Sequence, residues 1–110
     1  MSETYSFPKL AIQFVELSKQ LAELEVRILK LTLFPDWFHC WEMIVTKESE
    51  ALRFFYDGRD KYIQTETSRI RKLSFPNEWQ KVDAKAFETG SEAVRYAEDF
   101  LKKKFGKISG

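Results

Sequence analysis

The stretch LAIQFVELSKQLAELEVRILKL, residues 10–31, has the most regular apolar pattern in the chain. Its main apolar positions are separated alternately by four and three residues: Leu10, Phe14, Leu17, Leu21, Leu24, Ile28 and Leu31. This spacing is typical of an α-helix that buries one seam, because residues three and four apart lie on the same side of a helix. With Ser6 as N-cap and Pro8 in the first turn, the pattern predicts one helix that continues to about Leu33.

A second apolar band accompanies this seam, and its members are Ala11, Val15, Ala22, Val26, Leu29 and Leu33. A surface helix that covers one sheet needs only a single apolar stripe. The helix is therefore either buried on several sides within its own chain or packed against a second molecule as well. We expect the second arrangement, a homodimer whose interface contains Leu17, Leu21, Leu24, Ile28 and Leu31.

The middle of the chain has the composition of a small sheet. Phe34-Pro35-Asp36 would end the helix, because proline disfavours a helical conformation in the preceding residue. Alternating side chains predict three strands, at residues 37–46, 51–56 and 61–67. Asp57-Gly58 is expected to form the turn of the last hairpin, with glycine supplying a positive φ. Residues 69–73 would form a short fourth strand or extend the third.

The final third begins with a segment, residues 74–88, that lacks a clear period and is interpreted as a loop. Thr89 and Glu92 then match a capping box at the start of a second helix. Lys102, Lys103 and Lys104 fall in its last turn, and Gly106 follows as the C-cap. The expected fold is a single α+β domain over residues 1–110: a long N-terminal helix, an antiparallel meander of three to four strands, and a C-terminal helix.

Composition limits the function classes. A formal net charge of +1 exerts no strong pull on nucleic acid or on an anionic membrane. A single cysteine, Cys40, excludes an intrachain disulfide. There is no secretory leader pattern and no apolar run long enough to span a bilayer, so we expect a cytoplasmic protein without a membrane role.

Residues that could carry chemistry are few. His39 and Cys40 are neighbours on a predicted strand, where they would point to opposite faces, so they do not form a catalytic pair. Asp57, Asp60 and Glu66 surround the predicted hairpin, and turn formation accounts for the two aspartates. No Walker loop, dinucleotide fingerprint, nucleophile elbow or zinc-protease motif is present. We therefore predict no catalytic residue, no cofactor and no metal site.

These observations favour a small, non-enzymatic interaction protein that self-associates through its N-terminal helix, and an immunity or adaptor role would suit its size. The alternative is a nucleic-acid-binding module that uses the basic C-terminal third. Its candidate phosphate contacts are Arg69, Arg71, Lys72, Lys102, Lys103 and Lys104. We rank this alternative lower, because a solvated sheet edge and a helix dipole explain the same residues. A third alternative, ranked last, is a small enzyme or ligand site in an aromatic pocket near Trp41.

Overall fold

Two helices and five strands make up the part of the chain that the structure, a computed structural model, describes: residues 2–34, 40–70 and 78–106. Their order is α1 (Ser2–Glu23), β1 (Arg27–Phe34), β2 (Cys40–Lys47), β3 (Glu50–Asp57), β4 (Tyr62–Arg69), β5 (Gln80–Ala86) and α2 (Gly90–Phe105). The α+β class is confirmed, while the expected number of strands was too low. Neither described helix is long and apolar enough to cross a bilayer.

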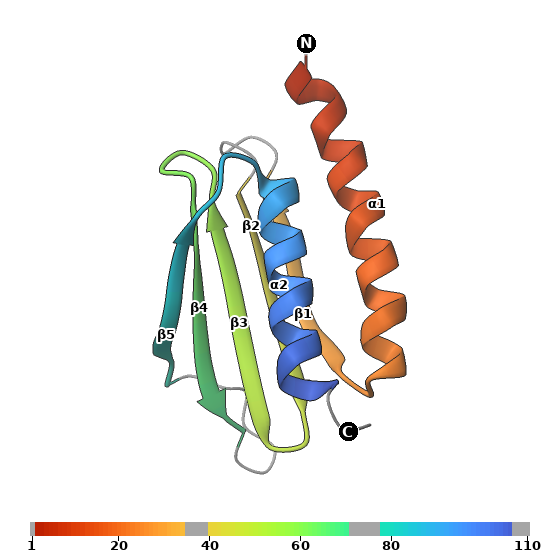
Figure 1. The fold of residues 1–110 in the computed structure, drawn as a ribbon, viewed down its shortest axis with the longest axis vertical. Helices are drawn as coiled ribbons and strands as arrows, with labels where there is room; N and C mark the ends of the chain where they lie inside the picture. Colours follow the sequence, from red (N-terminus) through yellow and green to blue (C-terminus); the bar gives the residue numbers. More distant parts are fainter. Residues whose placement is uncertain (1, 35–39, 71–77, 107–110) are drawn as a thin grey trace.

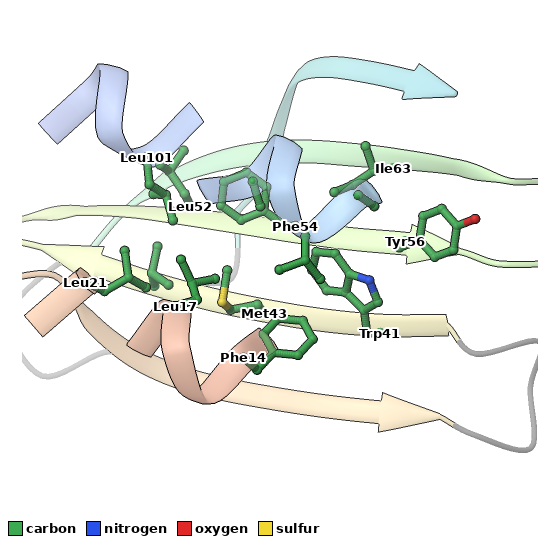
Figure 2. Packing of buried hydrophobic residues seen from close by; sticks show 14 of the residues in the cluster. Phe14, Leu17, Leu21, Trp41, Met43, Leu52, Phe54, Tyr56, Ile63 and Leu101 are labelled. Carbon is green, nitrogen blue, oxygen red and sulfur yellow. The ribbon is translucent and has the colours of Figure 1, made fainter. Parts of the chain in front are cut away.

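The strands form one antiparallel sheet in the order β1-β2-β3-β4-β5, and both helices lie on the same face of it (Figure 1). In the close view of Figure 2 the orange segments of α1 lie by β1 and β2 and the blue segments of α2 lie by β3, and α1 contacts both β1 and α2. Strand β2 is buried from Cys40 to Thr46.

The core lies between the helices and the sheet (Figure 2). Its largest members are Trp41, Phe54 and Tyr56, and the Phe14 ring of α1 meets the Trp41 ring edge-on with centroids 5.0 Å apart. Strand alternation sends the odd-numbered β2 side chains into this core and the even-numbered ones to the opposite face of the sheet. The side of α2 that faces this core carries the buried residues Ala93, Val94, Ala97 and Leu101.

The expected helix to Leu33 is wrong, because α1 ends at Glu23 and residues 27–34 form β1. The Val26 N–H donates to Leu21 O at 2.9 Å, and the Glu25 N–H donates to Ala22 O at 3.0 Å. With Glu25 in a left-handed conformation (φ 63°), these bonds make a Schellman motif without a glycine. The apolar residues continue after this turn because Ile28 and Leu33 of β1 pack against the same core as the apolar seam of α1. The spacing therefore resembles that of one longer helix.

Strand β5 lies inside the segment expected to be a loop, and this expectation is also wrong. Every β5 residue except Asp83 is exposed, so the strand has no apolar alternation from which to recognise it. Backbone pairing with β4 defines it instead, over Tyr62–Thr67 with one irregularity between Thr65 and Glu66.

The β3–β4 hairpin is confirmed, but its turn differs from the prediction. Gly58 does not have a positive φ, whereas Lys61 does, at 58°. The Lys61 N–H donates to Asp57 O at 2.7 Å, and the Asp57 carboxylate accepts from the backbone of Arg59 and Asp60. The aspartates therefore act in the turn, as their positions predicted.

The start of α2 is confirmed as a capping box. The Thr89 hydroxyl accepts from the Glu92 N–H, and the Glu92 carboxylate accepts from the Thr89 N–H. Gly106 is the C-cap, as predicted, and donates to Lys102 O at 2.8 Å.

Candidate interaction surface

The predicted interface residues do not share one environment. Leu17 and Leu21 are each 1% exposed and belong to the core of their own chain. Leu24 and Ile28 are partly buried against that core. Leu31 is 38% exposed. The helix seam is therefore covered largely by the chain's own sheet and by α2.

One flank of α1 faces α2. The Gln13 side chain donates to Ser91 O at 3.4 Å, near the start of α2. Gln20 and Leu24 line a shallow pocket together with Lys102 and Gly106 at the end of α2. These contacts leave the opposite flank of α1 turned away from the second helix.

A helix turns about 100° per residue, which defines the residues of this opposite flank. They are Ala11, Val15, Ser18 and Ala22, separated by four, three and four positions. Val15 is 54% exposed, and Ile12 beside it is 62% exposed. A second helical seam of small and apolar residues therefore lies at the surface.

Strand β1 continues this apolar surface at the edge of the sheet. Leu31 pairs with Met43, a core residue, so its side chain points to the face that carries the helices. Ile12, Val15, Ala22 and Leu31 are named here the α1–β1 surface. The sequence analysis noted the second apolar band of α1 but placed the predicted dimer interface on the first apolar seam. It did so because the end of the helix at Glu23 could not be recognised from the sequence.

The other edge of the sheet has a different character. Strand β5 carries Lys81, Asp83 and Lys85 along its seven residues. Its one large exposed apolar residue is Val82, at 50% exposure. Charged edge strands oppose pairing with another chain, so the two edges are not equivalent as association surfaces.

A row of paired charges crosses the face opposite the helices. Glu42 accepts from Lys30 of β1 at 3.2 Å and from Arg53 of β3 at 2.8 Å. Arg53 also reaches Glu66 of β4 at 3.1 Å, and its guanidinium lies 5.8 Å from the Trp79 ring centroid. Because cations and carboxylates alternate, the row compensates its own charge and offers no unbalanced charge to a ligand.

The predicted nucleic-acid contacts are brought partly together. Arg69 pairs with Glu50 in the sheet register, and Lys104 forms an ion pair with Glu50 at 3.0 Å. Lys102 forms an ion pair with Glu98 at 3.0 Å, while Lys103 is exposed. Arg71 and Lys72 lie outside the described residues. The basic groups thus meet at one end of the sheet, but Glu50 lies among them.

Trp41, near which the third alternative placed a ligand site, belongs to the hydrophobic core. Trp41 is fully buried, and its indole N–H donates to Gly90 O at 3.2 Å. The Tyr56 hydroxyl donates to Phe87 O at 2.9 Å. Burial, aided by nearby Glu88, raises the pKa of Tyr56 to about 12, so it keeps its proton at neutral pH. Both side chains therefore hold the β5–α2 connection to the core.

A second tyrosine, which is partly buried, ties β5 to α2. The Tyr96 hydroxyl of α2 donates to the carboxylate of Asp83. Burial, together with this hydrogen bond, raises the pKa of Tyr96 to about 12. Lys85 lies over the Tyr96 ring, 5.9 Å from its centroid.

Metal-binding chemistry has no support in the described residues, which contain no group of three or more His, Cys, Asp or Glu side chains that could hold an ion. His39 lies outside them, and Cys40 is buried and accepts from the Gly58 N–H at 3.3 Å. Comparison with known proteins finds no matching family model, curated protein or solved structure.

Proposed function

We propose that this protein is a non-enzymatic interaction module that self-associates through its N-terminal helix, using the α1–β1 surface. The observation that carries the proposal is the second seam of α1. Val15 is more than half exposed although it belongs to a regular row of small and apolar residues. Such a row on a solvated helix is typical of a surface that another helix covers.

A second copy of the same chain is the partner that fits this surface best. Ala11, Ser18 and Ala22 have small side chains, so they allow the close approach of another helix. Closed two-fold dimers are the commonest oligomers, and they bring the same patch of both subunits together. An immunity or adaptor role, in which a small domain binds another macromolecule, is consistent with this proposal.

Sedimentation equilibrium over a concentration series tests the proposal. The wild type is expected to dimerise, and Val15→Glu is expected to weaken the dimer about tenfold or more, because a carboxylate would be desolvated in the interface.

Val82→Glu is the matched control. Val82 has the same side chain and nearly the same exposure as Val15, 50% against 54%, but lies on the opposite edge of the sheet. This variant should dimerise like the wild type. A wild type that stays monomeric throughout the series, or a dimer that Val82→Glu weakens and Val15→Glu does not, would contradict the proposal.

A further inference from the structure

The unpaired edge of β1 is the strongest candidate for a contact that completes the α1–β1 surface. β1 is the first strand of the sheet order, so one side of its backbone has no neighbour among the described strands. Its sequence, RILKLTLF, has only two charged residues, Arg27 and Lys30, and Lys30 is engaged by Glu42. An apolar edge of this kind is suited to pairing with another strand.

From this edge we propose that two copies join by antiparallel pairing of β1 with β1, which creates one continuous ten-stranded sheet with all four helices on one face. This inference rests on the proposed self-association and specifies its geometry. The two-fold axis would stand perpendicular to the sheet, between the two β1 strands.

The position of α1 agrees with this symmetry. Neighbouring strands are about 4.8 Å apart, so the axis would lie roughly 2.4 Å from β1. α1 contacts β1 and packs Phe14 against Trp41 of β2, so it lies on the helix-bearing face near this axis. The two-fold would bring the two α1 helices together in antiparallel directions on the same face of the sheet. Val15 would be covered by the α1 helix of the second copy.

The register follows from the irregularity in β1. Pairing with β2 is interrupted between Ile28 and Lys30, which leaves residues 30–34 as the regular part of the strand. A two-fold through this part places Thr32 opposite Thr32 of the second copy. Leu31 then lies opposite Leu33, and Lys30 lies opposite Phe34. Threonine pairs and apolar pairs stabilise antiparallel strands, and the two Lys30 charges are kept apart.

Disulfide trapping tests this register. In a Cys40→Ser background, Thr32→Cys should form an interchain disulfide under mild oxidation, because directly opposed residues have Cα atoms about 5 Å apart. Lys30→Cys is the matched control on the same face of the same strand. Its two copies would be displaced by four residues, about 14 Å, which is too far for a disulfide.

Hydrogen exchange on the wild type provides a measurement that needs no substitution. Backbone amides of residues 30–34 should exchange more slowly as the dimer population rises, whereas amides of the β5 edge should not change. This result, together with a crosslink at Thr32→Cys and none at Lys30→Cys, supports the sheet pairing.

Failure of the register can be distinguished from failure of the self-association. A dimer that depends on Val15, but shows neither the Thr32→Cys crosslink nor slower exchange in β1, overturns the sheet pairing and leaves the proposed function standing. Equal crosslinking at Thr32→Cys and Lys30→Cys overturns the pairing as well. A wild type that stays monomeric overturns both.

Discussion

Arg53 donates from Nε to Oε2 of Glu42 at 2.8 Å, joining β3 to β2 on the face opposite the helices. The Glu42 side chain is only 10% exposed, and it accepts from Lys30 as well. A carboxylate at this depth is compatible with folding because two cations compensate it. Glu42 therefore connects β1, β2 and β3 through two charged hydrogen bonds that one substitution removes together.

Glu42→Ala should lower the free energy of unfolding by about 2 kcal/mol, because Lys30 loses its carboxylate and Arg53 keeps only Glu66. Glu98→Ala is the control, since Glu98 pairs with Lys102 one turn away on the same helix. Pairs of that type contribute about 0.5 kcal/mol. Urea denaturation of both variants measures the difference, and equal losses would show that the row of charges contributes no more than a surface pair.

Glu25→Gly should raise the free energy of unfolding by about 1 kcal/mol, because a left-handed conformation strains every residue except glycine. Glu23→Gly provides the contrast two positions earlier. Glu23 is the last residue of α1, so glycine there should lower stability by up to about 1 kcal/mol. Thermal denaturation of both variants checks the opposite signs; a loss of stability in Glu25→Gly would contradict the Schellman assignment.

Stability should fall as the pH rises from about 10 through about 12. The pKa values of Tyr56 and Tyr96 rise from 10.0 to about 12 in the folded protein, so the unfolded chain releases these protons first. The stabilising contribution of the two protonated tyrosines is fully present below the unfolded-state pKa of 10.0. It is lost as the pH rises through the folded-state pKa of about 12.

Tyr56→Phe should make this pH dependence shallower, although it also removes the hydrogen bond to Phe87 O. Urea denaturation across this pH range gives the slope for both proteins. Parallel slopes for wild type and Tyr56→Phe would show that the Tyr56 hydroxyl does not ionise with unfolding.

Nucleic-acid binding should be weak and without sequence preference near physiological ionic strength, because Lys104 and Lys102 are paired with carboxylates. Fluorescence anisotropy with labelled RNA and DNA at increasing salt measures it. The triple variant Arg69→Glu, Arg71→Glu and Lys72→Glu is the control that removes the predicted phosphate contacts. A tight, salt-sensitive complex that this variant abolishes would favour the nucleic-acid alternative.

Sequence reasoning predicted the elements whose signals are local. Thr89 and Glu92 specify the start of α2 through hydrogen bonds between close neighbours, and the structure contains both bonds. Strands β3 and β4 largely alternate between buried and partly buried side chains, and β2 is an apolar strand buried along its length, so their side chains identify them. In such segments local propensity and tertiary packing agree.

The elements that were missed depend on conformations or partners that residue type does not reveal. Glu25, Glu48 and Lys61 adopt positive φ, for which sequence rules expect glycine or asparagine. The first of these ends α1, and without a glycine the helix appeared to continue. Strand β5 is defined by its backbone pairing with β4. Its side chains are mostly exposed and lack the apolar alternation that would indicate a strand. The sequence analysis recognised both apolar bands of α1, but which of them is exposed became clear only from the position of α2.

The contrast between the two sheet edges determines how far association through strands can proceed. A sheet that accepted strands at both edges would grow without limit into a fibre. Lys81, Asp83 and Lys85 occupy the β5 edge, and the pairing of β5 with β4 is irregular there, so this edge resists the addition of a further chain. In the proposed dimer, pairing through β1 alone would stop at two chains, because each β1 edge is used up when it pairs and the β5 edge does not accept a further strand.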